Sequence, residues 1–260
     1  GAGMRIGILD VILGTSWDKL YSAASSVGFD GVELGVNASR AADSPLWQAP
    51  TRASLAEDAR RTGVETASLC IHGWGLHAAT PETREDAVKV AQEAVAFASE
   101  LGAKVILVPL AAPQDMSYDE AADAWVEALK AAGPQAAEAG VVLAMESVGR
   151  THTQSAERFE RLLERTEGIG VGIYYDVGNA LYQGYDPIGD IRRLGKSITQ
   201  VHVKQPGKYL LADGPLHMAK LIETLQEVGY DGYLVLETAT LDDAIASARA
   251  NLQFLRGVLG

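Results

Sequence analysis

The sequence predicts an α/β fold in a single domain, a closed (β/α)8 TIM barrel, and a repeated junction is the first reason. A helical segment ends at a glycine, and a short apolar run follows it. This junction occurs at Gly28, Gly63, Gly102, Gly140, Gly168, Gly195 and Gly229. Glycine is favoured just past a helix end because the left-handed backbone conformation there costs it little. With an opening run at Arg5 to Leu9, these junctions give eight candidate strands.

The second reason is the 3.6-residue period of the segments between the strands. Three of them begin at a residue able to cap a helix, namely Ser16, Thr80 and Ser117. A closing helix is expected from about Leu241, with Thr238 or Thr240 as its cap. Eight strands alternating with helices imply a closed parallel barrel. The alternative is an open doubly wound sheet, but no strand is followed by the G-x-G-x-x-G fingerprint of dinucleotide binding.

Length and composition fit one large core, because the chain has 260 residues of which 47% are hydrophobic. We expect one domain over residues 4–260, and we interpret residues 1–3, Gly1-Ala2-Gly3, as a cloning remnant ahead of Met4. A formal net charge of -12 disfavours nucleic acid and anionic membranes as partners, because their binding relies on Lys and Arg.

The single cysteine, Cys70, excludes an internal disulfide framework and fits a reducing compartment. No run approaches the roughly 18 apolar residues of a membrane span, and no basic segment followed by an apolar one opens the chain. The expected location is therefore the cytoplasm. Assembly as a homo-oligomer, a dimer or a tetramer, stays open.

Polar residues stand at the ends of four successive apolar runs in the second half of the chain. They are Glu146, Asp176, His202 and Glu237. Singly, each could be a helix cap, a salt-bridge partner or a hydrogen-bonded core residue. In a (β/α)8 barrel, however, the carboxyl ends of all strands meet at one rim, so the four should converge. Three carboxylates and one imidazole form a mixed oxygen and nitrogen shell that suits Mn²⁺, Mg²⁺, Co²⁺ or Zn²⁺.

Further polar and aromatic residues fall in loops that should overhang the same rim. We expect Lys204 and Lys208 to hold an anionic or hydroxyl-rich substrate, although a solvated lysine explains either of them equally well. Asn179 could cap the next helix or hold a substrate hydroxyl. His72 and Trp74 lie in a glycine-broken loop after the third strand, where pockets form, but the aromatic could equally be loop packing.

Two further residues lie on predicted strands. Glu33, at the end of the second strand, could order the barrel or touch a ligand. Cys70 is expected to be a small core residue, because nothing in the sequence places it beside a base.

The chain resembles the sugar phosphate isomerase/epimerase superfamily, the xylose isomerase-like TIM barrels. The segments that carry the resemblance are Gly28 to Leu34, Leu101 to Ile106, Glu146, Tyr175 to Asn179, His202 to Lys204, and Gly229 to Gly232 ahead of Glu237. The resemblance implies a divalent metal, Mn²⁺ first, bound by Glu146, Asp176, His202 and Glu237. In the 3-epimerases of the superfamily the two glutamates also serve as acid and base.

Within the superfamily the chain looks most like ketose phosphate 3-epimerases, with which it shares Ser68-Leu69-Cys70 and His202-Val203-Lys204. It departs from them at Gln205, where an Asp is usual. Free-ketose 3-epimerases carry a carboxylate, a histidine and an arginine where this chain has His152, Asn179 and Lys208, so free tagatose or psicose is not the first expectation. Of the histidine-rich three-zinc site of the endonuclease IV relatives, the four strand-end residues of this chain offer only His202.

These observations lead to one functional hypothesis and two alternatives. The hypothesis is an isomerase, a metal-dependent epimerase or isomerase of a small sugar or sugar phosphate. It would move a proton at the carbon next to a ketose carbonyl through a metal-stabilised enediolate, with Glu146 and Glu237 as acid and base. The first alternative is a lyase that dehydrates a keto-inositol or related polyol. The second is a sugar-binding barrel without turnover.

Overall fold

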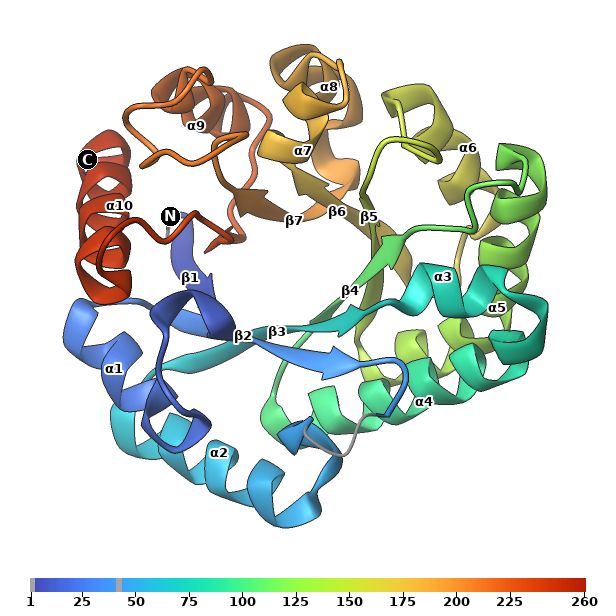
Figure 1. The fold of residues 1–260 in the computed structure, drawn as a ribbon, viewed down its shortest axis with the longest axis horizontal. Coiled ribbons are helices and arrows are strands. Elements are labelled where there is room, and N and C mark those ends of the chain that lie inside the picture. The colour runs from blue at the N-terminus through green and yellow to red at the C-terminus, as the bar shows by residue number, and fades with distance from the viewer. Residues whose placement is uncertain (1–2, 41–43) are drawn as a thin grey trace.

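The computed structural model describes residues 3–40 and 44–260 and forms a closed barrel of eight parallel strands (Figure 1). The strands follow one another in chain order around the barrel, and the last pairs with the first. The fold predicted from the sequence is therefore confirmed. Gly1 and Ala2, from the expected cloning remnant, lie outside the described residues.

Strands form the inner wall and helices the outer layer. The strands are β1 (Arg5–Leu9), β2 (Gly31–Asn37), β3 (Glu65–His72), β4 (Val105–Leu110), β5 (Val142–Ser147), β6 (Val171–Asp176), β7 (Ile198–Val203) and β8 (Tyr233–Leu236). The helices are α1 (Leu20–Val27), α2 (Ala49–Thr62), α3 (Trp74–Ala79), α4 (Arg84–Leu101), α5 (Tyr118–Ala139), α6 (Ala156–Arg165), α7 (Val177–Tyr182), α8 (Pro187–Leu194), α9 (Met218–Glu227) and α10 (Ala244–Leu259).

All seven junction glycines have positive φ, from 50° at Gly195 to 111° at Gly28. Four of them end a helix in the expected left-handed conformation, namely Gly28, Gly63, Gly102 and Gly140. Gly195 follows α8 but lies outside that conformation, with ψ at -122°. Among the expected caps, Ser117 accepts a hydrogen bond from the backbone N–H of Glu120, 3.2 Å away. Ser16 and Thr80 instead precede short 3₁₀ turns and make no capping bond.

The start of the closing helix differs from the sequence-based expectation. Helix α10 begins at Ala244, and Asp243 caps it by accepting a hydrogen bond from the N–H of Ala246 at 2.8 Å. The expected caps, Thr238 and Thr240, are wrong because the chain runs on as a loop over the rim before it turns into the helix.

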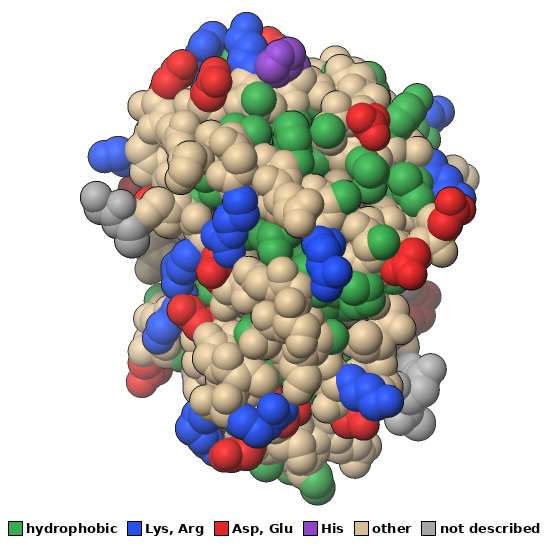
Figure 2. All heavy atoms as spheres, turned by 90° about the vertical axis from the view of Figure 1, so that its left-hand side faces the viewer, with side chains coloured by type: hydrophobic (Ala, Val, Ile, Leu, Met, Phe, Trp, Pro, Cys, Tyr) green, Lys and Arg blue, Asp and Glu red, His purple; other side chains and the backbone are tan. Residues whose placement is uncertain are grey.

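The core has two main parts. The larger lies between the strands and the helices. A smaller one, from alternate positions of five strands, fills the barrel interior and consists of Leu9, Cys70, Val105, Leu107, Ala144 and Tyr174. On the outside, the face that includes α10 carries Lys and Arg side chains interspersed with Asp and Glu (Figure 2). None of the helices in the described part of the chain has both the length and the apolar character that a bilayer crossing requires.

Substitution of a glycine inside α5 would test how tightly this helix packs on the barrel. A Cβ on Gly133 would lie 2.2 Å from the carbonyl oxygen of Ile169, whereas one on Gly257 in α10 would meet nothing within 4 Å. Alanine favours a helix over glycine by about 1 kcal/mol, but overpacking typically costs about 1–3 kcal/mol. We therefore expect Gly133→Ala to lower the free energy of unfolding by about 1–2 kcal/mol and Gly257→Ala to raise it by about 0.5–1 kcal/mol. Denaturant unfolding measures both, and a stabilised Gly133→Ala variant would contradict the packing.

Candidate metal centre

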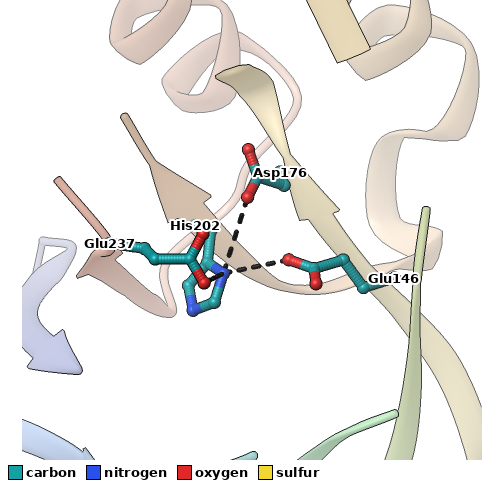
Figure 3. A group of neighbouring side chains, drawn as sticks. All are labelled: Glu146, Asp176, His202 and Glu237. Carbon is teal, nitrogen blue, oxygen red and sulfur yellow. Dashed lines mark hydrogen bonds and ion pairs between the residues drawn. The ribbon is translucent and has the colours of Figure 1, made fainter. Parts of the chain in front are cut away.

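Four side chains from the last four strands meet at the carboxyl end of the barrel (Figure 3). Glu146 lies on β5, Asp176 ends β6, His202 lies on β7 and Glu237 directly follows β8. One ligand atom from each lies within 4.8 Å of all the others. The structure thus brings together the four residues that the sequence analysis predicted to converge.

Strand register explains the convergence. Asp176 is the direct neighbour of His202 in the pairing of β6 with β7. Beyond the last paired residues of β7 and β8, the N–H of Glu237 donates to the carbonyl oxygen of Val203 at 3.3 Å, which extends the ladder by one residue. Because neighbouring strands end at the same level, their terminal side chains face a common centre.

Three carboxylates surround one imidazole nitrogen. The Nδ1 atom of His202 lies 2.9 Å from Glu146 Oε2, 3.5 Å from Glu237 Oε2 and 3.6 Å from Asp176 Oδ2. The buried Asp176 Oδ2 makes no hydrogen bond of good geometry with any described residue, although Lys204 Nζ is 3.1 Å away as an ion-pair partner. A buried carboxylate oxygen without a hydrogen bond is the kind of atom that a cation satisfies.

Burial and neighbouring charges shift the pKa values of the groups in this centre. Burial raises the pKa of Glu146 to about 8, and the charges of Glu237 and Asp176 add to the effect. Burial also opposes ionisation of Asp176, but the Lys204 ammonium and His202 outweigh it and lower the pKa of that carboxyl to about 2. The pKa of His202 is held well above its ordinary value, against the effect of burial, by carboxylates that include Glu33 and Glu237.

The donor set fits a divalent cation. Three carboxylates and an imidazole offer hard oxygen ligands with one nitrogen, as Mn²⁺ and its neighbours prefer. Even with Glu146 protonated, Lys204 and a protonated His202 supply two positive charges against the three carboxylates of Glu33, Asp176 and Glu237, so the group carries excess negative charge. A divalent ion would offset that excess and would take the place of the proton on Nδ1.

A fourth carboxylate, that of Glu33, positions the imidazole at its other ring nitrogen. Glu33 Oε1 lies 2.7 Å from His202 Nε2, and both side chains are fully buried. The other oxygen of Glu33 accepts hydrogen bonds from Ser68 Oγ and Tyr174 OH, each at 2.6 Å. Gln200 in turn donates to Ser68 Oγ at 2.8 Å and to Tyr174 OH at 3.1 Å. Glu33 therefore orders the barrel interior and holds the proton on Nε2, which leaves Nδ1 free to bind a metal.

Removing the charge of Glu33 tests its positioning role. In Glu33→Gln the side-chain amide cannot accept from His202, Ser68 and Tyr174 together, so the imidazole loses its fixed orientation. We expect the affinity for Mn²⁺ to fall by roughly 10- to 100-fold, as for other outer partners of metal-binding histidines. A metal titration measures this, with Glu65→Gln at an exposed ion pair as the matched control. If the folded Glu33→Gln variant binds Mn²⁺ as tightly as the wild type, Glu33 does not position His202 for the metal.

Comparison with known proteins identifies the family. The model of the family described as "Xylose isomerase-like TIM barrel" matches residues 21–258. The chain belongs to this family. The resemblance seen in the sequence is thereby confirmed.

The relatives of this xylose isomerase-like barrel are named for different activities. A provisionally named L-ribulose-5-phosphate 3-epimerase of Escherichia coli (strain K12) is 26% identical over 257 residues, covering 91% of this chain and 89% of the relative. An inosose dehydratase of Geobacillus kaustophilus (strain HTA426) is 25% identical over 265 residues, covering 88% of this chain and 82% of the relative. Among solved structures, the 3-keto-D-glucoside 4-epimerase of E. coli superposes with a TM-score of 0.84 at 19% identity, over 98% of this chain and 99% of that one.

Two of the other candidate residues of this xylose isomerase-like barrel lie beside the four. Lys204 Nζ bridges Asp176 and Glu237. Asn179 lies in α7, which Asp176 caps by accepting a hydrogen bond from the Asn179 N–H at 2.8 Å, while the Asn179 side chain donates to Ser147 O at 3.1 Å. Both border a cavity of about 340 Å³ that Glu237 also lines. Asn179 thus borders the cavity and braces β5.

The remaining candidates lie elsewhere. Lys208 is exposed on the loop and is not among the residues that line this cavity. His72 borders a separate cavity together with Asn37 and His77. Trp74 is fully buried in the core, where its indole donates to Ala87 O at 3.0 Å. The loop-packing interpretation therefore describes Trp74, because α3 turns the indole away from the barrel mouth.

Proposed function

We propose that this chain is a divalent-metal-dependent epimerase or isomerase of a sugar or sugar phosphate, with Mn²⁺ as the first candidate ion. The observation that carries the proposal is the placement of Glu146 and Glu237, whose carboxylates reach the same centre from opposite sides (Figure 3). Inversion at a carbon requires one group to remove a proton and another to return it from the other face. The reaction is proton transfer at the carbon next to a ketose carbonyl.

The two glutamates differ in their exposure to solvent and in their contacts. Glu146 has a side chain only 5% exposed, whereas that of Glu237 is 28% exposed and borders the cavity. Lys204 holds one oxygen of Glu237, which directs the other toward the centre. The bound ion would supply Lewis-acid stabilisation of the enediolate. The Lys204 ammonium is placed to offset negative charge on a neighbouring substrate oxygen.

A dehydratase of a keto-inositol or related polyol is the second candidate. The relative named inosose dehydratase matches this chain at nearly the same identity and coverage as the relative named for epimerase activity. Removing a proton next to a carbonyl is also the first step of such a dehydration, so the same glutamates serve both reactions. Loss of water from the product distinguishes the lyase.

The test is a panel of ketoses, ketose phosphates and keto-inositols incubated with the Mn²⁺-loaded protein in D₂O and followed by NMR. An epimerase incorporates deuterium at the carbon next to the carbonyl and yields the epimer. A dehydratase yields a product that has lost water. If no compound exchanges a proton while some of them bind, the chain is a sugar-binding barrel and the proposal is wrong.

A further inference from the structure

The cavity beside the metal centre is shaped by three rim segments that meet there. Its lining comes from α7, the loop after β7 and the loop after β8, and it includes Asn179, Tyr182, Lys204, Pro206 and Thr238. These segments are closely packed, since a Cβ on Gly178 would lie 2.5 Å from Lys204 Cγ. The volume of about 340 Å³ is at the small end of ligand sites, so the cavity suits one sugar-sized group.

Its electrostatics disfavour an anion. Lys204 is the one cationic side chain in the lining drawn from the described residues, and its ammonium is already paired with Asp176 and Glu237. A phosphate in the cavity would therefore find no cationic side chain of the described lining free of carboxylate partners, while Glu237, itself in the lining, would repel it.

Other cations lie near the rim without lining the cavity. The guanidinium of Arg150 stacks on the Tyr182 ring, 4.2 Å from its centroid, and Lys208 is exposed on the loop. A charge at the solvent edge is weakened by water and salt, so neither offsets the carboxylates at the depth of the cavity.

Two side chains of the lining suit an uncharged, hydroxyl-bearing group. Thr238 is 4% exposed, and its hydroxyl has no hydrogen-bond partner among the described residues. A buried hydroxyl is costly unless it is paired, so rotation of the Thr238 side chain toward the cavity would let a ligand hydroxyl complete it. Tyr182 is 54% exposed despite its size and borders the same cavity. Arg150 covers one face of this ring, so the other face is the one that can meet the C–H groups of a sugar, with the polar tip for its hydroxyls.

Building on the proposed function, we propose that the cavity receives the uncharged, hydroxylated part of the substrate, with Thr238 and Tyr182 as specificity-determining residues. The substrate class is then a free sugar or cyclic polyol rather than a phosphate ester. This assignment narrows the sugar or sugar phosphate of the proposed function to its unphosphorylated members.

The test measures equilibrium binding to the Mn²⁺-loaded protein by calorimetry, so that it does not depend on turnover. The probes are D-tagatose against D-tagatose 6-phosphate, L-ribulose against L-ribulose 5-phosphate, myo-inositol, and inorganic phosphate as a competitor. We expect an uncharged probe to bind at least tenfold more tightly than a phosphate ester. Thr238→Val should weaken that binding roughly three- to tenfold, the effect of one hydrogen bond, whereas Thr238→Ser keeps the hydroxyl and the affinity.

Tyr182→Ala should weaken binding by a similar factor, with Tyr209→Ala as the matched control at another exposed tyrosine of the rim. The proposal is overturned if a phosphate ester binds more tightly than its free sugar, if inorganic phosphate competes, if Thr238→Val binds like wild type, or if no uncharged probe binds. Deuterium exchange, recorded separately, distinguishes this failure from that of the proposed function. If uncharged probes bind selectively but no proton exchanges, the proposed function is wrong and the cavity assignment holds. If protons exchange but uncharged probes are not preferred, the cavity assignment is wrong and the proposed function holds.

Discussion

Replacing His202 with alanine should abolish tight binding of Mn²⁺ and the stabilisation that the metal provides. The imidazole is the single nitrogen donor of the group, and three carboxylates lie within 3.6 Å of its Nδ1 atom. At a metal concentration 100 times the dissociation constant, binding to the native state stabilises a protein by about 2.7 kcal/mol. We expect Mn²⁺ to raise the free energy of unfolding by this amount in the wild type and hardly at all in His202→Ala. Metal analysis after dialysis and thermal unfolding with and without Mn²⁺ measure it.

Two further variants make the result interpretable. His217→Asn alters an exposed histidine that caps α9 and should retain the full metal increment. His202→Asn keeps a polar side chain next to Glu33, in case the alanine variant does not fold. A folded variant at position 202 that binds as much metal as the wild type would refute the site.

Much of the architecture could be predicted because it depends on local signals. A glycine after each helix and an apolar run after each glycine are visible in the sequence, and their alternation leaves few alternatives to a closed barrel. The four residues of the centre followed from the same logic. In parallel strands the carboxyl ends share one rim, so the position of each residue along its strand was enough to bring them together.

The residues that the sequence left undecided depend on contacts between distant segments. Glu33 and His202 are 169 positions apart, and their pairing follows from which side chains point inward on β2 and β7. The same is true of Tyr174, which reaches Glu33 across the barrel. Trp74 and Lys208 were expected at the rim because they lie in loops that follow strands. Position in a loop does not say whether a side chain turns toward the mouth, the core or solvent.

The Glu146→Gln and Glu237→Gln variants should separate the two halves of the proposed proton transfer. In Glu237→Gln, Glu146 remains able to remove the proton of one epimer and to return a deuteron to the same face. That variant should incorporate deuterium from D₂O into one epimer while its rate of interconversion falls roughly 10²- to 10⁴-fold, the usual contribution of a general acid or base. Glu146→Gln should show the complementary selectivity and label only the other epimer.

Because both glutamates belong to the metal centre, the metal content of each variant must be known before the exchange is interpreted. A loss of exchange with a loss of metal reports on binding, whereas selective exchange with retained metal reports on proton transfer. An isomerase that moves a proton between adjacent carbons works on one face, so a single glutamate would then be critical in both directions. If both variants keep their metal and still interconvert the epimers at near wild-type rate, Glu146 and Glu237 are not the acid and base.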